Sequence, residues 1–478
     1  MPTLAFLIDF GSTFTKLVAV DLDTAELIGR SQAPSTVGTD VREGLLQALT
    51  ILHERHQVFD RAPKDLSVLD GKVVCASSSA AGGLRIAVVG NVPGLTVEAA
   101  NQAALGAGAK IVGSTAFKLT PEKVDALREL RPDMILLTGG VDGGDQATIL
   151  HNARLLAEST LTVPVVVAGN IAAAAEVQSI LQRGGKETMP VDNVMPRAGT
   201  LAVEAAREEI RKLFMERITQ AKGLDQVKEF VPVVLPTPMA VLEGIHLGAD
   251  GTKAEKGWGD MLLVDVGGAT TDVHSIGYGV PAGEHVITRG LAEAYAKRTV
   301  EGDLGIRFNA GTIVTKVGVK KLTDDLRRDF PLGQVTEQSF GEYIKRISDQ
   351  TATVPLERWH SAADAVLARA AVDLAVARHV GRRERIVARE GEAWMHSGKD
   401  LRDTRIMIGT GGVFVHNPFA AYILSQPVAG DDRVQALRPR QPNLYVDSSY
   451  LLYAVGLLSE QHPEIALRIF KRYVTPMA

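Results

Sequence analysis

Short runs of apolar residues that end in glycine turns recur along the whole chain. The clearest are ILLTGGVDGG (135–144), LLVDVGGATTDV (262–273) and IMIGTGGVF (406–414). Continuous apolar runs of this length are typical of strands buried in an α/β sheet. Between them lie segments with helical periodicity, such as DVREGLLQALTILHER (40–55) and PEKVDALREL (121–130). This alternation of strands and helices predicts an α/β protein.

One strand pattern occurs twice. FLIDFGSTFTKLVAVD (6–21) and LLVDVGGATTDVHSIG (262–277) both read as an apolar strand, an aspartate, a glycine, small or hydroxyl residues and a second apolar strand. In each half a double glycine ends a later strand, at Gly139 and at Gly411. The two halves therefore resemble duplicated domains.

The length of the chain also predicts more than one domain. At 478 residues it exceeds the size at which a single hydrophobic core stops growing. Prolines, glycines and charges interrupt the periodic pattern between the two halves. We predict domains at 1–245 and 258–478.

Composition excludes several classes of function. A net charge of −4 and the lack of a basic run argue against a nucleic-acid-binding surface. Cys75 is the only cysteine, so no disulfide framework and no cysteine-based zinc or iron–sulfur site is available. No apolar stretch approaches the length of a membrane span. We expect a cytoplasmic protein that is neither secreted nor membrane-spanning.

The first repeated hairpin carries the groups that bind an anion. With glycine at the bend, successive backbone N–H groups can point into one concavity, and hydroxyls and an ammonium group add further donors. Asp9, at the end of the strand, would repel phosphate unless a divalent cation stood between them, so its expected role is to hold Mg²⁺ or its waters. The candidate phosphate ligands are Gly11, Ser12, Thr13, Thr15 and Lys16.

The second hairpin offers the same groups. Two such loops facing each other across a cleft would clamp a nucleoside triphosphate. The alternative is that each hairpin is only a glycine-rich turn with solvated polar residues. That alternative is weaker for two hairpins followed by a glycine turn at Gly411 than for one alone. The residues of the second set are Asp265, Gly267, Gly268, Thr270, Thr271 and Asp272.

The motifs resemble those of a known superfamily. The hairpins are similar to the phosphate-1 and phosphate-2 motifs of actin, sugar kinases and heat-shock chaperones, and IMIGTGGVF is similar to the adenosine motif. Further blocks narrow the resemblance to the glutamate mutase accessory family called MutL or GlmL, which is unrelated to the mismatch-repair protein of that name. They include SSAAGGLRIAVVG, AALGAGAKIVG, ILLTGGVDGGDQATILHNA, VVVAGN, DNVMP and KRTVEGDLG.

The resemblance implies a fold, ligands and a partner. The fold would be two duplicated actin-like (ribonuclease-H-like) domains with a nucleotide cleft between them. The ligands would be ATP and Mg²⁺. The function would be that of an ATP-hydrolysing chaperone or reactivase, a monomer or homodimer, for the subunits of an adenosylcobalamin-dependent mutase such as glutamate mutase. We expect the protein to act on the cobalamin-loaded enzyme rather than to carry cobalamin, because no cobalamin-ligand motif is recognised in its sequence.

The resemblance also assigns residues to roles. Asp9 and Asp265 would serve the metal, and Asp265 and Asp272 are the candidates for orienting the attacking water. A glycine-rich turn would pass under the nucleoside, where a Cβ would collide with it; its residues are Gly409, Thr410, Gly411 and Gly412.

Three charged residues are weaker candidates for contacts with adenine or ribose. They are Lys297, Arg298 and Glu301, on a stretch over 292–305 that reads as helical. The alternative for this stretch is an ordinary solvated helix face.

Two other classes of function remain open. One is a small-molecule kinase, or another ATP-using enzyme, on the same fold. The other is a nucleotide-binding scaffold with little turnover. A fold alone does not choose among these functions.

Overall fold

The computed structural model describes residues 3–11, 14–36, 39–79, 84–218, 227, 230–231, 233–280, 286–331, 333, 335–388, 391–425 and 434–477. Within these residues the strands form four sheets, which are described below in the order five, six, five and four strands. Two of the sheets repeat one topology. The third is inserted into the first repeat, and the fourth extends from the second repeat.

The first sheet has the order β10-β4-β1-β2-β3. β2 is antiparallel to both β1 and β3, whereas β4 is parallel to β1 and β10 is parallel to β4. The helix expected over 40–55 is α1 (Val41–His56), which covers one face of this sheet. The strands are β1 (Leu4–Phe10), β2 (Phe14–Asp21), β3 (Glu26–Pro34), β4 (Val73–Ser78) and β10 (Val233–Pro236), and a single helical turn spans Leu66–Leu69.

The second sheet has the order β14-β12-β11-β17-β19-β20. β12 is antiparallel to β11 and β14, β17 is parallel to β11, β19 is parallel to β17, and β20 is added antiparallel at the edge. The strands are β11 (Met261–Val266), β12 (Thr271–Ile276), β14 (Ala296–Glu301), β17 (Ile406–Thr410), β19 (Asn443–Asp447) and β20 (Val474–Pro476).

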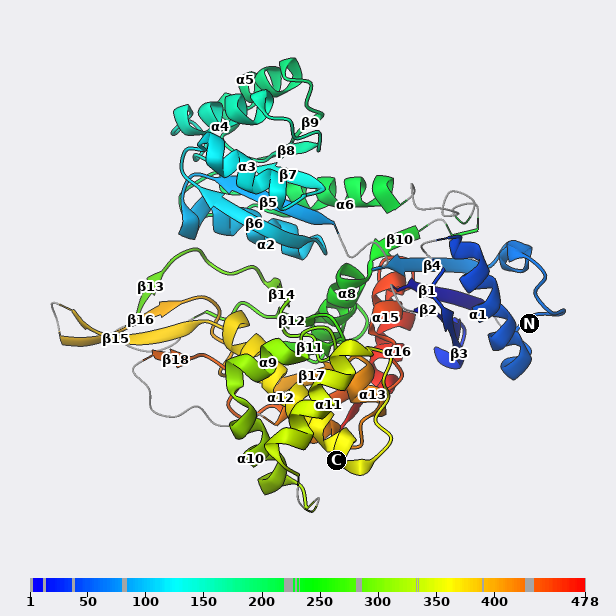
Figure 1. Ribbon diagram of the computed structural model, residues 1–478. Coiled ribbons are helices and arrows are strands. Elements are labelled where there is room, and N and C mark those ends of the chain that lie inside the picture. Colours follow the sequence, from blue (N-terminus) through cyan, green and yellow to red (C-terminus); the bar gives the residue numbers. More distant parts are fainter. Residues whose placement is uncertain are drawn as a thin grey trace.

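The two sheets share one topology. Numbered within each repeat, the first five strands have the order 3-2-1-4-5, with strand 2 antiparallel to strands 1 and 3 in both. This is the actin-like (ribonuclease-H-like) arrangement, so the predicted α/β fold with duplicated domains is confirmed. Figure 1 shows β1 to β4 of the first sheet in blue, beside the green-to-red elements of the second repeat.

A pair of helices fills the layer between the two sheets. α8 (Thr237–Asp250) follows a strand of the first sheet but also packs on β11 and β12 of the second. α15 (Leu452–Leu458) follows a strand of the second sheet and packs on β1 and β4 of the first. They lie side by side in Figure 1. The predicted break after residue 245 falls inside α8.

Glycines allow these two helices to touch. A Cβ on Gly456 would overlap the carbonyl oxygen of Ala240 and lie 2.6 Å from its carbonyl carbon. A Cβ on Gly244 would likewise collide with the carbonyl oxygen of Leu452. The two backbones therefore approach at a distance that no side chain permits.

Further helices cover the outer face of the second sheet. The largest is α12 (Arg358–His379), whose buried side is mostly alanine and valine and packs against Leu262 and Val264 of β11. The others are α9 (Ala310–Val317), α10 (Val319–Asp329), α11 (Glu337–Asp349), α13 (Gly412–His416), α14 (Ala420–Leu424) and α16 (Pro463–Tyr473), of which α16 packs on α8 and α15 instead.

A complete parallel sheet is inserted between β4 and β10. Its order is β6-β5-β7-β8-β9, and Figure 1 shows it, with its helices, as a body above the two repeats. We call these elements the insert. Its strands are β5 (Arg85–Gly90), β6 (Lys110–Ala116), β7 (Met134–Leu137), β8 (Val165–Val167) and β9 (Thr188–Pro190). Its helices are α2 (Glu98–Gly106), α3 (Pro121–Glu129), α4 (Ala147–Glu158), α5 (Ile171–Arg183) and α6 (Glu204–Ile218), with one turn at Pro93–Val97.

The insert shows that the match of Gly139 with Gly411, drawn from the sequence, is wrong. Gly139 follows β7, a strand of the insert, and has no counterpart in the repeated sheets. Gly411 follows β17, and the strand in the same position of the first sheet is β4. The segment after β4 is therefore the counterpart of the Gly411 turn, and its residues 80–83 lie outside the described residues.

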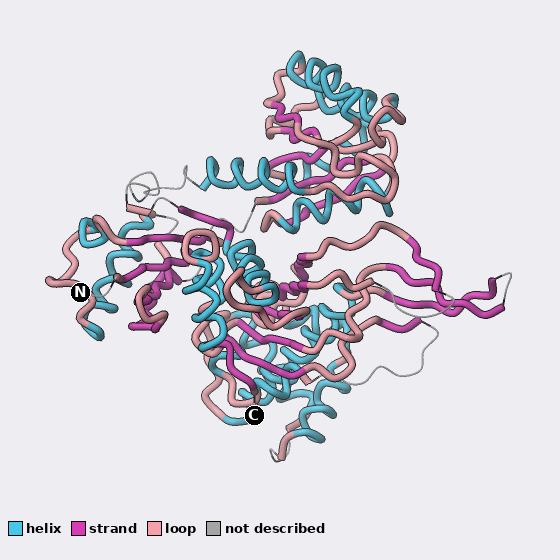
Figure 2. The backbone as a smooth tube through the Cα atoms, turned by 180° about the vertical axis from the view of Figure 1, so that it is seen from behind, coloured by secondary structure: helices cyan, strands magenta, loops and turns pink. Residues whose placement is uncertain are grey.

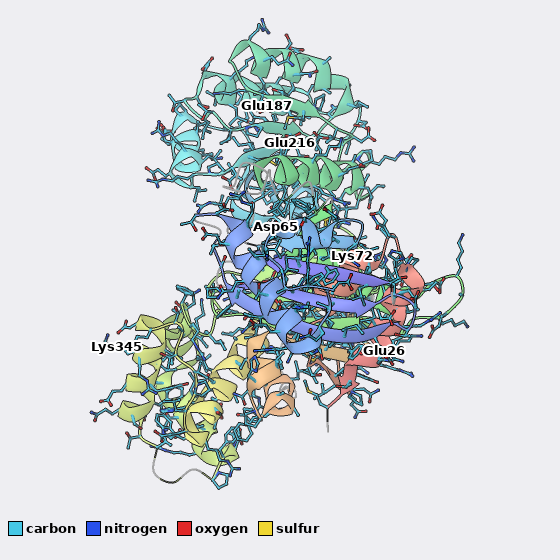
Figure 3. All side chains as sticks on the ribbon, turned by 90° about the vertical axis from the view of Figure 1, so that its right-hand side faces the viewer. Glu26, Asp65, Lys72, Glu187, Glu216 and Lys345 are labelled. Carbon is cyan, nitrogen blue, oxygen red and sulfur yellow. The ribbon has the colours of Figure 1, made fainter. Side chains whose placement is uncertain are left out.

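The fourth sheet forms an arm that projects from the second repeat (Figures 1 and 2). Its order is β13-β16-β15-β18, from β13 (Val286–Arg289), β15 (Arg382–Ala388), β16 (Gly391–Ser397) and β18 (Val434–Ala436). Charged side chains such as Glu187 on the insert and Lys345 on the second repeat are exposed (Figure 3). No helix among the described residues is long and apolar enough to cross a bilayer.

Candidate functional site

Alternation along the strands places the acids of both hairpins in the layer between the sheets. Ala5 and Leu7 of β1 face α8 and α15, and Asp9 lies on the same side because successive side chains alternate. Met261 and Leu263 of β11 also face α8 and α15, and by the same alternation Asp265 lies on their side of the strand. The equivalent acids of the two repeats therefore face a common layer.

Asp9 is held by neighbours from three elements. Its side chain is 2% exposed, and its Oδ1 accepts hydrogen bonds from Oγ of Ser77 at 3.1 Å and from Oγ1 of Thr237 at 2.6 Å. The ammonium group of Lys16 lies 3.6 Å from Oδ2. Gly11 closes the hairpin by donating its N–H to the carbonyl of Phe14 at 3.0 Å. Ser12 and Thr13, two predicted phosphate ligands, lie outside the described residues.

The second hairpin closes in the same way. Gly267 donates its N–H to the carbonyl of Thr270 at 2.9 Å. The carbonyl of Gly268 accepts hydrogen bonds from the N–H groups of Arg307 and Phe308, both at 2.9 Å, which fixes the bend against the following segment. Asp265 lies opposite Asp272 of β12. The second hairpin thus repeats the geometry of the first.

Two predicted phosphate ligands face away from this layer. The side chain of Thr15 is fully buried on the α1 side, next to Gly44 of that helix. Thr271 is also fully buried, and its Oγ1 donates to the carbonyl of Leu304 at 2.8 Å. The structure does not bring either threonine hydroxyl together with the acids.

The glycine turn after β17 packs directly on the second hairpin. Thr410 of β17 lies opposite Asp265. Gly411 has φ +99°, and a Cβ there would lie 2.5 Å from the carbonyl oxygen of Val266 and 2.7 Å from Oδ1 of Asp265. Only glycine fits this position. Gly409 is constrained by the ring of Phe414, whereas Gly412 begins α13 with open space around its Cα.

Lys16 connects the two repeats. Its ammonium group lies 3.7 Å from the ring centroid of Tyr450, in the second repeat, so that it is shared between Asp9 and an aromatic face. Its positive charge also acts on Asp265. Burial, and then the negative charge of Asp272, raise the pKa of Asp265 from 3.8 to about 7, although Lys16 opposes the shift.

This shift predicts a pH-dependent stability of the ligand-free protein. Because the folded state holds a proton on Asp265 that the unfolded chain releases, the stabilising effect is present below pH 3.8 and is lost as the pH rises to about 7. One titrating group contributes a slope of at most about 1.4 kcal/mol per pH unit. We expect Asp265→Asn to be less sensitive than wild type between pH 4 and 7 in urea unfolding. Parallel curves for the two proteins would contradict the shift.

Sequence reasoning missed two residues of the site. Asp447, at the end of β19, is buried and accepts the N–H groups of Leu451 and Leu452 at the start of α15, as well as Oγ1 of Thr410. Its signal was an apolar strand ending in aspartate, as in the two hairpins. Tyr450 has φ +54°, a conformation that is strained for an aromatic residue, and no pattern indicated it.

The prediction of a helix over 292–305 is wrong, because residues 296–301 form β14 at the edge of the second sheet. The three charged side chains of this stretch pair with protein groups. Lys297 binds the carbonyl of His379 and Glu293, Arg298 binds Asp272, and Glu301 pairs with Arg378. Their contact with adenine or ribose stays a prediction.

A cobalamin-ligand spacing was overlooked. Residues 272–277 read Asp-Val-His-Ser-Ile-Gly, which is an Asp-x-His-x-x-Gly segment. The histidine, His274, is 1% exposed, lies within β12 opposite Arg298, and has its pKa lowered to about 3 by burial. A side chain enclosed in a sheet cannot reach a cobalt ion, so the segment is not evidence for a bound cobalamin.

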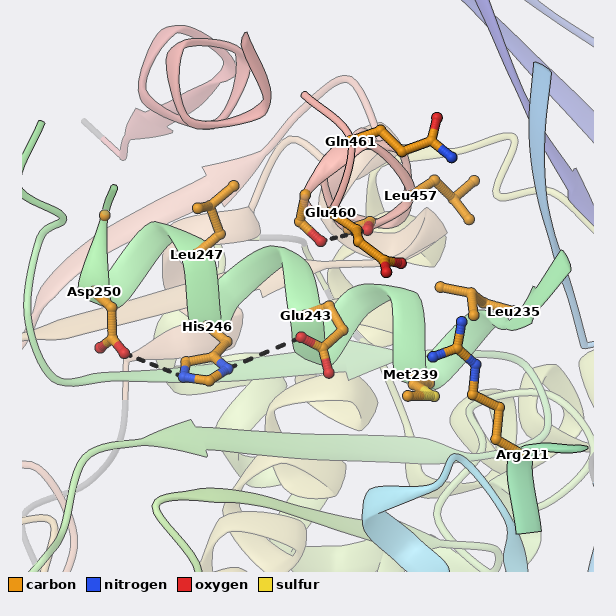
Figure 4. Close-up of a pocket in the computed structure, with 13 residues that line it drawn as sticks. Arg211, Leu235, Met239, Glu243, His246, Leu247, Asp250, Leu457, Glu460 and Gln461 are labelled. Carbon is orange, nitrogen blue, oxygen red and sulfur yellow. Dashed lines mark hydrogen bonds and ion pairs between the residues drawn. The ribbon is translucent and has the colours of Figure 1, made fainter. Parts of the chain in front are cut away.

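A pocket lies elsewhere, away from the hairpins. It has a volume of about 500 Å³ and is bounded by α8, the end of α15 and Arg211 of α6 (Figure 4). His246 lies between Glu243 and Asp250 along one side of α8, with Nε2 3.1 Å from the carboxylate of Asp250. No hairpin residue lines it.

Comparisons with known proteins place the chain in a family. The model of the family described as MutL protein matches residues 5–474. Protein MutL of Clostridium tetanomorphum is 40% identical over 474 residues, which cover 98% of both chains.

Solved structures match loosely. Nucleotide-free acetone carboxylase has a TM-score of 0.39 at 10% identity and covers 96% of this chain and 70% of its own. The activator of 2-hydroxyisocaproyl-CoA dehydratase from Clostridium difficile, with bound ADPNP, has a TM-score of 0.32 at 12% identity and covers 99% of each chain. Superpositions at this level carry no information about ligand or function.

Proposed function

Because the chain belongs to the MutL protein family, we propose that it binds Mg·ATP between its two hairpins and hydrolyses it as an accessory protein of an adenosylcobalamin-dependent mutase such as glutamate mutase. The observation that supports nucleotide binding most directly is the meeting of Asp9, Lys16 and Asp265 in one layer between the repeats. The client is inferred from the sequence resemblance.

The donor set fits a magnesium ion that arrives with its nucleotide. Among the described residues, no three His, Cys, Asp or Glu side chains gather as a metal site. Mg²⁺ at a phosphate site needs only one or two carboxylates, since phosphate oxygens and waters complete its shell. Asp9 and Asp265 would supply these carboxylates. The ion, when bound, would neutralise charge on the phosphates.

Residues of the chain would bind the phosphates and orient the attacking water. Lys16 would leave the ring of Tyr450 and contact a phosphate, because an anion in the layer competes for its charge. Because the N–H groups of Gly11 and Gly267 close the hairpins, the residues that follow them at the bends would offer their backbone N–H groups to the phosphates. Asp265, at the end of β11 in the same layer, would orient the attacking water. Asp272, fixed by Arg298, would hold the hairpin in place.

Titration calorimetry with ATP, with and without Mg²⁺, tests this function. We expect wild type to bind ATP more tightly with Mg²⁺. Asp9→Asn should weaken Mg·ATP binding by about tenfold or more, since one charge-assisted contact is worth that much. Binding of metal-free ATP should weaken less, because that carboxylate repels the phosphates.

The matched control is Asp21→Asn. Asp21 is buried at the opposite end of the same hairpin, where it pairs in register with Leu4, far along the strand from the bend. The Asp21→Asn variant should bind Mg·ATP with the affinity of wild type. Equal affinity of Asp9→Asn and wild type, or the absence of any ATP binding, would refute the proposed nucleotide site.

A further inference from the structure

One arginine joins the second hairpin to the insert. Arg298 of β14 donates from Nε and Nη2 to Oδ1 of Asp272, at 2.9 and 2.6 Å. Its Nη1 donates to the backbone carbonyls of Leu105 and Ala109, at 3.3 and 3.2 Å. The side chain of Arg298 is only 4% exposed. A single planar group therefore binds the candidate nucleotide site on one side and the insert on the other.

The chemistry of this contact requires arginine. The carbonyl of Leu105 lies in the last turn of α2, where helix carbonyls carry partial negative charge, and it also accepts the N–H of Gly108, whereas the carbonyl of Ala109 lies just beyond the helix. A guanidinium presents donors in a fixed fork and can serve these carbonyls and a carboxylate at once. A lysine at Arg298 would keep the charge, but its one nitrogen could not span both sides.

The carboxylate of Asp272 is fixed at both oxygens. Oδ2 accepts a hydrogen bond from Oγ1 of Thr270, at the bend of the hairpin, at 3.1 Å. Oδ1 is taken by Arg298. A movement of the bend is therefore passed to the guanidinium, because breaking a buried ion pair is costly.

A second tie connects α2 to the same segment. The N–H of Ala294 donates to Oε1 of Gln102, a residue of α2 that is 6% exposed, at 3.2 Å. Close by, Lys297 pairs with Glu293 at 3.0 Å. In Figure 1, α2 lies on the side of the insert that faces β14, and the two elements are in contact. The insert thus rests on residues 293–298 through α2.

We propose that Arg298 is a positioning residue that couples the orientation of the insert to the nucleotide bound at the second hairpin. In one nucleotide state the hairpin holds Asp272 and Arg298 as described, and α2 stays docked. In the other, a displaced bend draws the guanidinium from the two carbonyls and releases α2. This coupling rests on the proposed function, since it needs a nucleotide at the hairpins, and it requires two states of different energy.

Hydrogen exchange on the full chain tests the coupling. Amide exchange over 98–116 is measured without nucleotide, with Mg·ADP and with a non-hydrolysable Mg·ATP analogue. We expect wild type to differ between the two nucleotides in this segment. Arg298→Lys should lose most of that difference and lower kcat about tenfold, while its Kd for Mg·ATP changes by less than about threefold.

The control variant is Arg402→Lys. Arg402 forms a comparable ion pair with Asp400 in the same repeat, and no hydrogen bond or ion pair joins that pair to α2 or to the described residues of the hairpins. It should keep the wild-type exchange difference and kcat. If only Arg298→Lys loses the exchange difference between the two nucleotides, the coupling through Arg298 is supported. Equal losses in both variants refute it.

The outcomes separate the two proposals. If wild type binds no Mg·ATP, the proposed function fails. If wild type binds and hydrolyses ATP, but Arg298→Lys retains both kcat and the exchange difference, the coupling is wrong and the function stands. Should Arg298→Lys not fold, Gln102→Leu decides, because it removes the second tie, together with a hydrogen bond from Gln102 to Glu98, and leaves Arg298 in place. A reduced exchange difference at unchanged kcat supports the coupling, and an undiminished one contradicts it.

Discussion

We expect Gly456→Ala to lower the free energy of unfolding more than the addition of a methyl group at any other glycine. The added Cβ would overlap the carbonyl oxygen of Ala240 on α8, and the atoms around it are backbone atoms that cannot rotate away. The two helices form the layer between both repeated sheets, so moving them apart opens the core on either side. Overpacking of this kind costs about 3 kcal/mol or more. Urea unfolding, followed by circular dichroism, measures the loss.

A glycine in open space provides the control. Gly341 lies within α11, and no atom comes within 4 Å of a Cβ built on it. Gly341→Ala should leave stability unchanged or raise it by up to about 1 kcal/mol, because alanine favours the helix. If Gly456→Ala were as stable as Gly341→Ala, the close crossing of α8 and α15 would be wrong.

The repeated fold could be predicted because its signal is local. Each hairpin consists of an apolar strand, an aspartate and a glycine bend, and hydrogen bonds from Gly11 and Gly267 close the two bends alike. The insert could not be separated from the first repeat, because its strands also end in glycine turns. Gly139 was therefore matched with Gly411, although it follows a strand of another sheet.

The side of the sheet that each residue faces was harder to predict. Across a tight bend, the alternation of strand residues does not tell which side chains continue on the same face. Thr15 and Thr271 were grouped with the acids and instead pack under helices on the other face. The alanine-rich stretch before Arg298 favoured a helix locally, but pairing with β12 made it a strand.

Contacts between distant segments were out of reach of any motif. Tyr450 has its role because Lys16, more than four hundred residues earlier in the chain, lies over its ring. Arg298 likewise depends on the carbonyls of Leu105 and Ala109, which belong to the insert. Both contacts join parts of the chain that the sequence offers no means of placing side by side.

A purpose for ATP hydrolysis follows from the proposed client. Cobalamin mutases work through radicals, and a radical that escapes leaves damaged cobalamin enclosed in the enzyme. Opening such an enzyme costs free energy, and a partner with equal affinity for the open and closed forms cannot shift that balance. A γ-phosphate held between Lys16 and the second hairpin, and lost on hydrolysis, would give two states with different outer surfaces and client affinities.

Reactivation of a mutase is therefore expected to require ATP and Asp265. A cognate adenosylcobalamin-dependent mutase is first inactivated by turnover. Wild-type protein, Mg²⁺, ATP and fresh adenosylcobalamin should then restore its activity, whereas omission of ATP should lower the recovery rate about tenfold or more. Asp265→Ala should fail likewise, because it removes both the proposed metal ligand and the group that orients water.

Asp21→Asn, which alters a buried carboxylate away from the bend, should reactivate the mutase as wild type does. Recovery that is equally fast without ATP would refute an ATP-driven reactivase and leave a nucleotide-binding scaffold. Stoichiometric phosphorylation of a small metabolite in the same mixture would instead identify a kinase. If Asp265→Ala matched wild type in both ATP turnover and reactivation, the assignment of Asp265 would be wrong, because β11 would then end without a carboxylate.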